Sequence, residues 1–281
     1  MNLTNYHSHC SFCDGQAPAE EFVKSAISAG FTAYGISSHA PLPFPTTWSL
    51  TQEKVTDYLS ELNVLKKQYA NQIELYIGME IDYLRNFQQP ADVYFQQLPL
   101  DYRIGSVHLL STDEGIIVDT DTNVELFVTQ IKQYFQGNLR KVVERYYEAS
   151  FELVESGGFD FLGHTDKISF NAEQCEPGIT LQSWYQSLRK EFFGFVAQKG
   201  MMMEINTKSF LRRGCFFPDQ RYFAEIRRLN IPVLVNSDAH SPELIAVGRK
   251  EALALLVEYG FKSVCELHAG KWLEVPIDIT E

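Results

Sequence analysis

Asn5-Tyr6-His7-Ser8-His9 opens the chain with a short extended segment that carries two histidines. Side chains two residues apart on a strand point to the same face, so the imidazoles of His7 and His9 lie together. Such a pair is either one half of a metal site or, equally, two hydrogen-bonded histidines at the surface. The positions of the remaining histidines decide between the two interpretations.

Length, composition and charge limit the classes of protein that this sequence can encode. The chain has 281 residues, of which 45% are hydrophobic, and one α/β barrel domain is a normal outcome at this size. The formal net charge of −12 argues against nucleic acid or an anionic membrane as a partner, since both attract clustered positive charge. No apolar run is long enough for a bilayer and no signal peptide precedes the first strand, so we expect a cytoplasmic protein.

The cysteines do not indicate a disulfide framework, because they are five in number and scattered along the chain. Cys10-Ser11-Phe12-Cys13 has C-x-x-C spacing, but no second pair of this kind completes a zinc knot. We therefore favour a structural interpretation of these cysteines over a redox or metal-binding one.

Helical and extended patterns alternate along the chain. We expect helices over 18–29, 51–69, 181–198 and 242–259, one that begins at an N-cap at Asp219, and two within 123–156 divided near Gly137-Asn138. After the opening segment, we expect strands over 31–38, 73–79, 101–107, 159–163, 201–205 and 232–235. Seven strands separated by helices predict a parallel sheet in a single domain over 1–281, with residues 261–281 as a tail packed on the barrel.

Potential metal ligands follow the expected strands at the points where these end. In barrels of parallel strands the carboxyl ends form the active site, so residues distant in sequence converge there. A single histidine at such a position is more often structural than a ligand, but here the pattern repeats. His268, in the tail, lies outside it. The residues at strand ends are His7, His9, His39, Glu80, His108, His164, Asp238 and His240.

At this point the sequence resembles a known family, the polymerase and histidinol phosphatase (PHP) superfamily. The similarity runs from residue 5 to about residue 250 and is closest in character to the monofunctional histidinol-phosphatases. It implies a distorted (β/α)7 TIM-like barrel that holds three metal ions at the carboxyl ends of its strands. The motifs that carry the resemblance are His7-Ser8-His9 with Asp14, Ser37-Ser38-His39, Gly78-Met79-Glu80, Gly105-Ser106-Val107-His108, Gly163-His164 and Asn236-Ser237-Asp238-Ala239-His240.

The resemblance also implies a distribution of ligands among three divalent ions. The first ion would be held by His7, His9, Glu80 and Asp238, the second by Glu80, His108 and His164, and the third by Asp14, His39 and His240. Many relatives have a histidine where this chain has Asp14, and often an acidic residue where it has Ser38. Imidazole and carboxylate ligands are compatible with Zn²⁺, Fe²⁺ or Mn²⁺, and the sequence does not select one of them.

The resemblance implies a metal-dependent phosphomonoesterase that hydrolyses L-histidinol phosphate in histidine biosynthesis. The charge of three divalent ions exceeds that of their three carboxylate ligands, so the centre attracts phosphate within an acidic protein. Our hypothesis is that a hydroxide that bridges two of the metals attacks phosphorus in line. The residues expected to carry catalysis are His7, His9, Glu80, Asp238 and His240.

Residues near the later strands are candidates for contacts with the substrate. Lys167, Lys208, Arg212 and Arg213 are the candidate phosphate-binding cations, although a pair such as Arg212-Arg213 is more often a solvated loop. Asp82, Asp166 and Glu204 would either accept the cationic amine of histidinol or, as we favour, orient a ligand histidine.

Three alternatives stay open. The first is a PHP phosphatase or phosphoesterase that acts on another small phosphate ester. The second is an amidohydrolase, which also begins with an His-x-His strand but commonly bridges its metals with a modified lysine. Here the fourth strand ends in His108 and the bridging candidate is Glu80. The third is a non-catalytic metal-binding module. The oligomeric state is unknown from the sequence.

Overall fold

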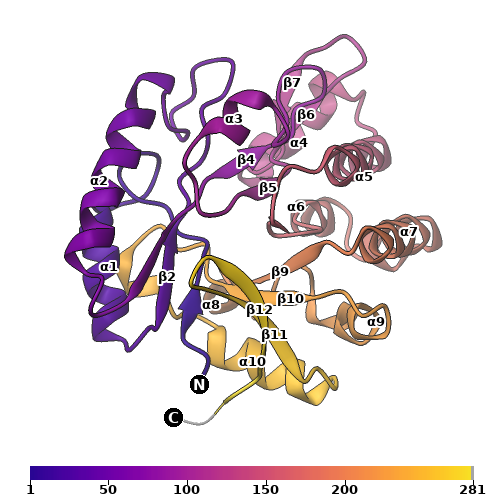
Figure 1. Ribbon diagram of the computed structural model, residues 1–281. Helices are drawn as coiled ribbons and strands as arrows, with labels where there is room; N and C mark the ends of the chain where they lie inside the picture. The colour runs from indigo at the N-terminus through magenta and orange to yellow at the C-terminus, as the bar shows by residue number, and fades with distance from the viewer. Residues whose placement is uncertain (280–281) are drawn as a thin grey trace.

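The computed structural model describes residues 1–279, in which the parallel strands form two sheets with helices around them (Figure 1). The first sheet has the order β1 (Thr4–Asn5), β2 (Ala33–Ile36), β3 (Glu74–Ile77). The second has the order β10 (Val233–Asn236), β9 (Met202–Asn206), β8 (Phe161–Leu162), β5 (Ile104–Ser106), β4 (Glu80–Asp82). The chain is therefore an α/β protein, as the alternating patterns predicted.

The helices lie outside the two sheets (Figure 1). Their apolar faces pack inward, as in α5, where Val142, Tyr146 and Leu153 are buried. The N-cap predicted at Asp219 is confirmed, since its side chain accepts the backbone N–H of Arg221, and Asn138, at the predicted division between two helices, caps α5 by accepting the N–H of Lys141. The helices are α1 (Ala19–Ser28), α2 (Val55–Gln68), α3 (Val93–Gln97), α4 (Val124–Tyr134), α5 (Leu139–Ser156), α6 (Ile168–Cys175), α7 (Ser183–Lys199), α8 (Phe210–Arg213), α9 (Phe223–Arg228) and α10 (Arg249–Glu258).

Two isolated parallel bridges connect the two sheets, one between Ser8 after β1 and Ala239 after β10, and one between His39 after β2 and Glu80 of β4. Each bridge lies just beyond the carboxyl end of a strand and either contains or adjoins a predicted metal ligand. The hydrogen-bonded ladders themselves do not continue from one sheet into the other. The distorted seven-stranded barrel therefore stays a prediction.

The strand predicted over 73–79 corresponds to β3, which ends at Ile77, two residues earlier than predicted, and β4 begins directly after Gly78-Met79. The ring of Tyr102 fills the space beside Gly78, where an added Cβ would lie 2.2 Å from Tyr102 Cζ. The hydroxyl of Tyr58 donates to the carbonyl oxygen of Gly78 at 2.7 Å. Glu80 therefore follows β3 of the first sheet, as predicted, and also begins β4 of the second.

The helix predicted over 242–259 is also divided, into a 3₁₀ turn at Pro242–Leu244 and α10. Gly248 separates them with φ of +65°, and its Cα packs against Phe210 and Thr207 so closely that no side chain would fit. The sequence did not predict α3, α6 and α8, nor the antiparallel hairpin of β6 (Leu109–Ser111) and β7 (Ile117–Asp119).

The tail forms an antiparallel hairpin of β11 (Ser263–His268) and β12 (Lys271–Pro276). Trp272 of β12 packs against Tyr6 and Phe161, with ring centroids 5.1 and 5.8 Å apart. Two hydrogen bonds also join the hairpin to the starts of strands. The backbone N–H of Ala269 donates to Glu74, which begins β3, and Trp272 Nε1 donates to Asp160, which precedes β8. The hairpin thus covers the amino ends of the strands, whereas the predicted ligands follow their carboxyl ends (Figure 1).

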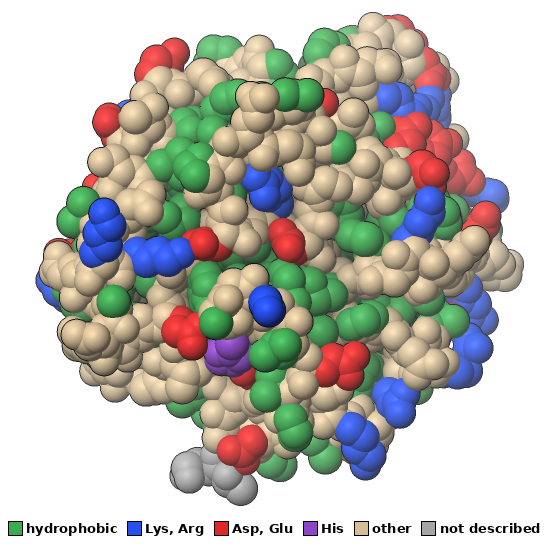
Figure 2. Space-filling model, in the orientation of Figure 1, with side chains coloured by type: hydrophobic (Ala, Val, Ile, Leu, Met, Phe, Trp, Pro, Cys, Tyr) green, Lys and Arg blue, Asp and Glu red, His purple; other side chains and the backbone are tan. Residues whose placement is uncertain are grey.

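On the face covered by the hairpin, Lys and Arg side chains are dispersed among Asp and Glu and do not gather in one patch (Figure 2). This distribution agrees with the acidic net charge of −12. Within residues 1–279, no helix combines the length and the apolar character that crossing a membrane requires.

Candidate metal centre

The structure brings the nine predicted metal ligands together where the parallel strands end. His7 and His9 follow β1, His39 follows β2, and Glu80 begins β4. His108 follows β5, His164 follows β8, and Asp238 and His240 follow β10. Asp14 reaches the same place from the turn after His9. Parallel strands carry their carboxyl ends to one side of a sheet, which is why residues more than 200 positions apart meet.

Glu80 lies at the middle of this group and is fully buried. Of the histidines within residues 1–279, five place a ring nitrogen within 3.6 Å of its carboxylate. His7, His9 and His39 approach Oε2, at 3.2, 3.4 and 2.9 Å. On the other side, His108 and His164 approach Oε1, at 3.6 and 2.8 Å. The two oxygens of one carboxylate therefore face two separate sets of imidazoles.

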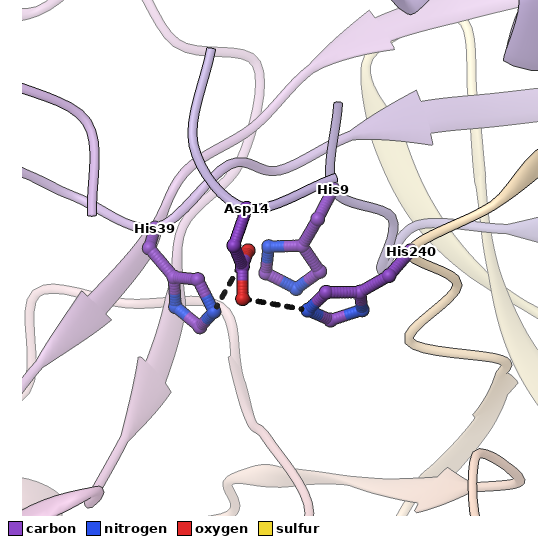
Figure 3. A group of neighbouring side chains, drawn as sticks. All are labelled: His9, Asp14, His39 and His240. Atoms are coloured by element: carbon purple, nitrogen blue, oxygen red, sulfur yellow. Dashed lines mark ion pairs between the residues drawn. The ribbon is translucent and has the colours of Figure 1, made fainter. Parts of the chain in front are cut away.

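Asp14, His39 and His240 form a second part of the centre, closer to solvent (Figure 3). Asp14 lies between the two rings, with Oδ1 3.8 Å from His39 Nε2 and Oδ2 3.3 Å from His240 Nε2. The ring of His9 packs against both, with centroids 4.2 Å from each. Asp14 is exposed and His240 half-buried, so this part of the centre opens to the outside.

The contact groups in the structure overlap and do not reproduce the predicted division among three ions. His9 lies with Asp14, His39 and His240, and His164 lies with His7 and Asp238 as well as beside Glu80. All nine predicted residues belong to at least one group of side chains whose ligand atoms lie within 4.8 Å of one another. The assignment of each residue to a particular ion stays a prediction.

Several histidines are held by a hydrogen bond at the ring nitrogen that faces away from Glu80. Glu204 Oε1 lies 2.8 Å from His7 Nδ1, and Asp82 Oδ1 lies 2.8 Å from His108 Nδ1. This is how ligand histidines are commonly oriented, since the partner fixes both the tautomer and the ring position. The positions of Asp82 and Glu204 are consistent with the favoured expectation that these residues orient ligand histidines. Asp166 instead accepts hydrogen bonds from Tyr147 and Tyr185.

The carboxylates of the centre are ionised despite their burial. Burial favours the neutral acid of Glu80, but the surrounding histidines, His7 first, outweigh it and hold the pKa well below its ordinary value. Burial also favours the neutral acid of Asp238, but the nearby charges of Lys208 and His7 outweigh it, so the pKa of Asp238 is likewise well below its ordinary value. Burial, together with Lys167, lowers the pKa of His164 to about 4, which leaves this imidazole neutral and able to donate a lone pair.

Buried polar atoms at the centre lack hydrogen-bond partners among residues 1–279, which is the main sign that it fits metal ions. The unpartnered atoms include His7 Nε2, His9 Nε2, His39 Nδ1 and Glu80 Oε2, which face one another. Leaving such atoms unpaired is costly, and divalent cations bound at the centre would satisfy them. Imidazoles and carboxylates without a thiolate form a donor set suited to Zn²⁺, Fe²⁺ or Mn²⁺.

The backbone is strained at the same place. His164, Asp166 and Asp238 have φ of +22°, +65° and +49°, in or near the left-handed region that non-glycine residues rarely adopt. Strain of this kind costs on the order of 1–3 kcal/mol for each residue and persists where the surrounding structure enforces it. Of these three residues, His164 and Asp238 are predicted ligands, and Asp166 follows His164 by two positions.

A cavity of about 690 Å³ adjoins the centre, and Asp238 and His240 form part of its wall. The four predicted cations, Lys167, Lys208, Arg212 and Arg213, also line it. Lys208 Nζ lies 3.1 Å from Asp238 Oδ1, at the end of the cavity nearest the metal centre. The structure therefore brings together the residues that the sequence suggested for phosphate binding.

Sequence reasoning missed three residues beside these groups. Asp121 lines the cavity and forms an ion pair with Lys167 at 2.6 Å, but it follows the unpredicted hairpin of β6 and β7. Trp48 packs against His39 with centroids 4.9 Å apart, from a proline-rich loop without periodicity. Cys13 Sγ lies 3.6 Å from His9 Nδ1, and its C-x-x-C spacing was the one signal available.

Comparison with known proteins places the chain among related sequences. The PHP domain model matches residues 5–208. A protein of Schizosaccharomyces pombe named "Probable histidinol-phosphatase" is 25% identical, over 94% of this chain and 89% of its own length. The histidinol-phosphatase of Bacillus subtilis is also 25% identical, over 85% of this chain and 94% of its own length.

A solved structure shares the fold. The histidinol phosphate phosphatase of Lactococcus lactis, complexed with zinc, L-histidinol and phosphate, superimposes with a TM-score of 0.68. The match covers 96% of this chain and 98% of that one, at 20% sequence identity. The similarity is therefore one of fold across nearly the whole chain.

Proposed function

The chain belongs to the PHP domain family, and from this premise we propose that it hydrolyses L-histidinol phosphate to L-histidinol and phosphate. The relatives named as histidinol-phosphatases match it over most of their length, and the solved relative contains zinc, L-histidinol and phosphate. The observation that carries the proposal is Glu80, whose two carboxylate oxygens face two sets of histidines.

We propose three divalent ions, each Zn²⁺, Fe²⁺ or Mn²⁺, with the ligands predicted from the family pattern. Glu80 would be shared between an ion held with His7, His9 and Asp238 and an ion held with His108 and His164. Asp14, His39 and His240 would hold the third. Divalent ions in such a centre supply Lewis acidity, which activates water and offsets the charge of the phosphoryl group.

The side chains of this chain bind and orient the ester. Lys208, beside Asp238, and Lys167 would donate to phosphate oxygens, and Arg212 and Arg213 would add donors further along the cavity. The cationic amine of histidinol requires an acidic or aromatic lining, which Asp121, Glu125, Phe170 and Phe217 supply in the same cavity.

We also propose that the two sheets are parts of one distorted (β/α)7 barrel within a single domain of residues 1–281. The isolated bridges at Ser8 and at His39, which connect the two sheets, support this description. The direct passage of the chain from β3 of the first sheet to β4 of the second through Gly78-Met79 also supports it.

The test is phosphate release by purified, metal-quantified protein from L-histidinol phosphate and from a panel of other small phosphomonoesters, with and without chelator. A high kcat/KM confined to L-histidinol phosphate and lost on chelation is the expected result. Equal or faster hydrolysis of another ester would contradict L-histidinol phosphate as the specific substrate but would leave the proposed phosphatase reaction in place. Absence of hydrolysis from all the esters at full metal occupancy would overturn the phosphatase and leave a different hydrolase or a metal-binding module.

A further inference from the structure

A cysteine thiol lies against one histidine of the metal centre. Cys13 Sγ is 3.6 Å from His9 Nδ1, on the turn that follows the histidine pair. The other ring nitrogen, Nε2, is buried without a hydrogen-bond partner, 3.2 Å from Asp238 Oδ1 and 3.4 Å from Glu80 Oε2. One imidazole therefore has a sulfur atom on one side and two carboxylates on the other.

The hydrogen of this thiol has another acceptor. Cys13 Sγ lies 3.5 Å from the backbone carbonyl oxygen of Cys10, which can only accept, so the S–H donates there. The lone pairs of the sulfur are then left to accept the Nδ1–H of His9. This contact raises the share of the His9 tautomer that carries its hydrogen on Nδ1, whereas the carboxylates beside Nε2 oppose that tautomer until a cation lies between them and the ring.

Carboxylates orient two other histidines of the centre through the same ring nitrogen, Nδ1. Glu204 holds His7 at Nδ1 and Asp82 holds His108 at Nδ1, each at 2.8 Å. Cys13 occupies the equivalent position beside His9, with a sulfur acceptor in place of an anionic oxygen. The C-x-x-C spacing, for which the sequence suggested no role in chemistry, thus places one of its two cysteines against a predicted ligand.

We propose that Cys13 is a positioning residue of the metal centre, which holds His9 in the Nδ1–H tautomer so that Nε2 is free to bind a divalent ion. The inference rests on the proposed binding of metal and not on the identity of the ester. Loss of a partner that orients a ligand histidine typically weakens metal binding by about 10- to 100-fold. Cys13 should therefore affect metal affinity although it binds no ion itself.

The experiment compares three variants with the wild-type protein. Cys13→Val fills nearly the same volume without an acceptor, Cys13→Ser restores an acceptor, and Cys10→Ala removes a buried sulfur from the same turn that does not contact His9. Zinc retained against increasing chelator measures affinity. In the metal-free protein, the ¹⁵N shifts of His9, assigned by comparison with His9→Gln, report the tautomer.

We expect Cys13→Val to lose zinc at about 10-fold less chelator than the wild-type protein and to show more of the Nε2–H tautomer of His9. Cys13→Ser should be close to wild type in both measurements, and Cys10→Ala should be unchanged. Cys13→Val with wild-type affinity and tautomer would overturn the inference. An equal loss in Cys10→Ala would also overturn it, because packing of the turn would then be the cause. If no ester is hydrolysed and Cys13→Val still loses zinc affinity and the tautomer, the inference holds while the proposed function fails.

Discussion

Glu80 is the residue on which the proposed centre depends most. Its carboxylate is fully buried and lies within 3.6 Å of five imidazoles from four segments of the chain. Ser106 Oγ also donates to Oε1 at 2.6 Å, which fixes the plane of the carboxylate. An ionised carboxylate with both oxygens directed at separate ligand sets is what a shared ligand of two cations requires.

Glu80→Gln tests this role with little change in shape. We expect kcat to fall by about 10³-fold or more and bound metal to decrease, because a neutral amide cannot serve two cations as a bridging anion. Phosphate release and metal per chain are the measurements. Glu155→Gln, on the surface beside Lys199, is the matched control and should change neither. Turnover within a few-fold of wild type in Glu80→Gln would exclude a shared ligand here.

At the residue level, eight of the nine predicted ligands were proposed because they fall at the ends of expected strands, whereas Asp14 was proposed only from the family resemblance. His108 and His164 are identifiable in this way, since burial of a strand and a polar residue at its end leave a local pattern. Asp121 and Trp48 leave no such pattern. They reach the cavity or the metal centre through loops whose course depends on packing against distant elements, and no periodicity records that course.

At the level of elements, the break between β3 and β4 turns the chain so that Glu80 faces the histidines. The break coincides with the close approach of Tyr102 to Gly78, where only a hydrogen atom fits. Gly35 of β2 meets the same ring, with an added Cβ 2.2 Å from Tyr102 Oη. The glycines on neighbouring strands thus make room for one aromatic side chain between the sheets.

Gly78→Ala should destabilise the protein by about 1–3 kcal/mol, since the added methyl group has to displace the buried ring of Tyr102. Gly194→Ala is the matched control. Gly194 lies inside α7 with open space around it, and the same substitution there should stabilise by about 0.5–1 kcal/mol. Urea unfolding measures both. If both substitutions changed the free energy of unfolding in the same direction, the contact with Tyr102 would not restrict the side chain at position 78.

Elements with a sustained period were predicted well, and those without one were not. The core of α2 has Val55, Tyr58, Leu62 and Leu65 buried at helical spacing, and its predicted range was nearly correct. The strand over 73–79 was predicted to run up to Glu80, but β3 ends at Ile77, before Gly78. Gly is unfavourable within a strand, and the contact of Gly78 with Tyr102 is one that a single segment of sequence does not contain.

At the level of the whole molecule, the C-terminal hairpin closes the side opposite the metal centre. Trp272 contacts Tyr6, Tyr102 and Phe161, which come from the first strand and from segments near two strands of the second sheet. The tail was predicted to pack on the barrel, but its two strands and its aromatic contacts were not predicted. Four consecutive residues of β11 are buried and most of β12 is exposed, so neither strand shows the alternation of buried and exposed residues by which a strand is recognised.

Trp272→Ala should lower the free energy of unfolding by about 3 kcal/mol, the low end of the range for a buried aromatic side chain, because Trp272 is only partly buried. Leu273→Ala changes the next residue of β12, whose side chain is 49% exposed, and should cost about 0.5 kcal/mol or less. Chemical denaturation of the two variants provides the measurement. Similar losses in both would mean that the aromatic contacts do not anchor the hairpin.

The hairpin also sets an order of events during synthesis. Tyr6 precedes the first histidine, and its hydroxyl accepts from the backbone N–H of Leu267 at 2.8 Å, across 261 positions of sequence. A ribosome that adds about 5–20 residues each second needs on the order of 10–50 s to make the intervening chain. For that time the opening histidines exist without the neighbour that anchors their strand. Tyr6 therefore gains this contact only after Leu267 has been made, and metal uptake by the complete centre requires His240 to have been made as well.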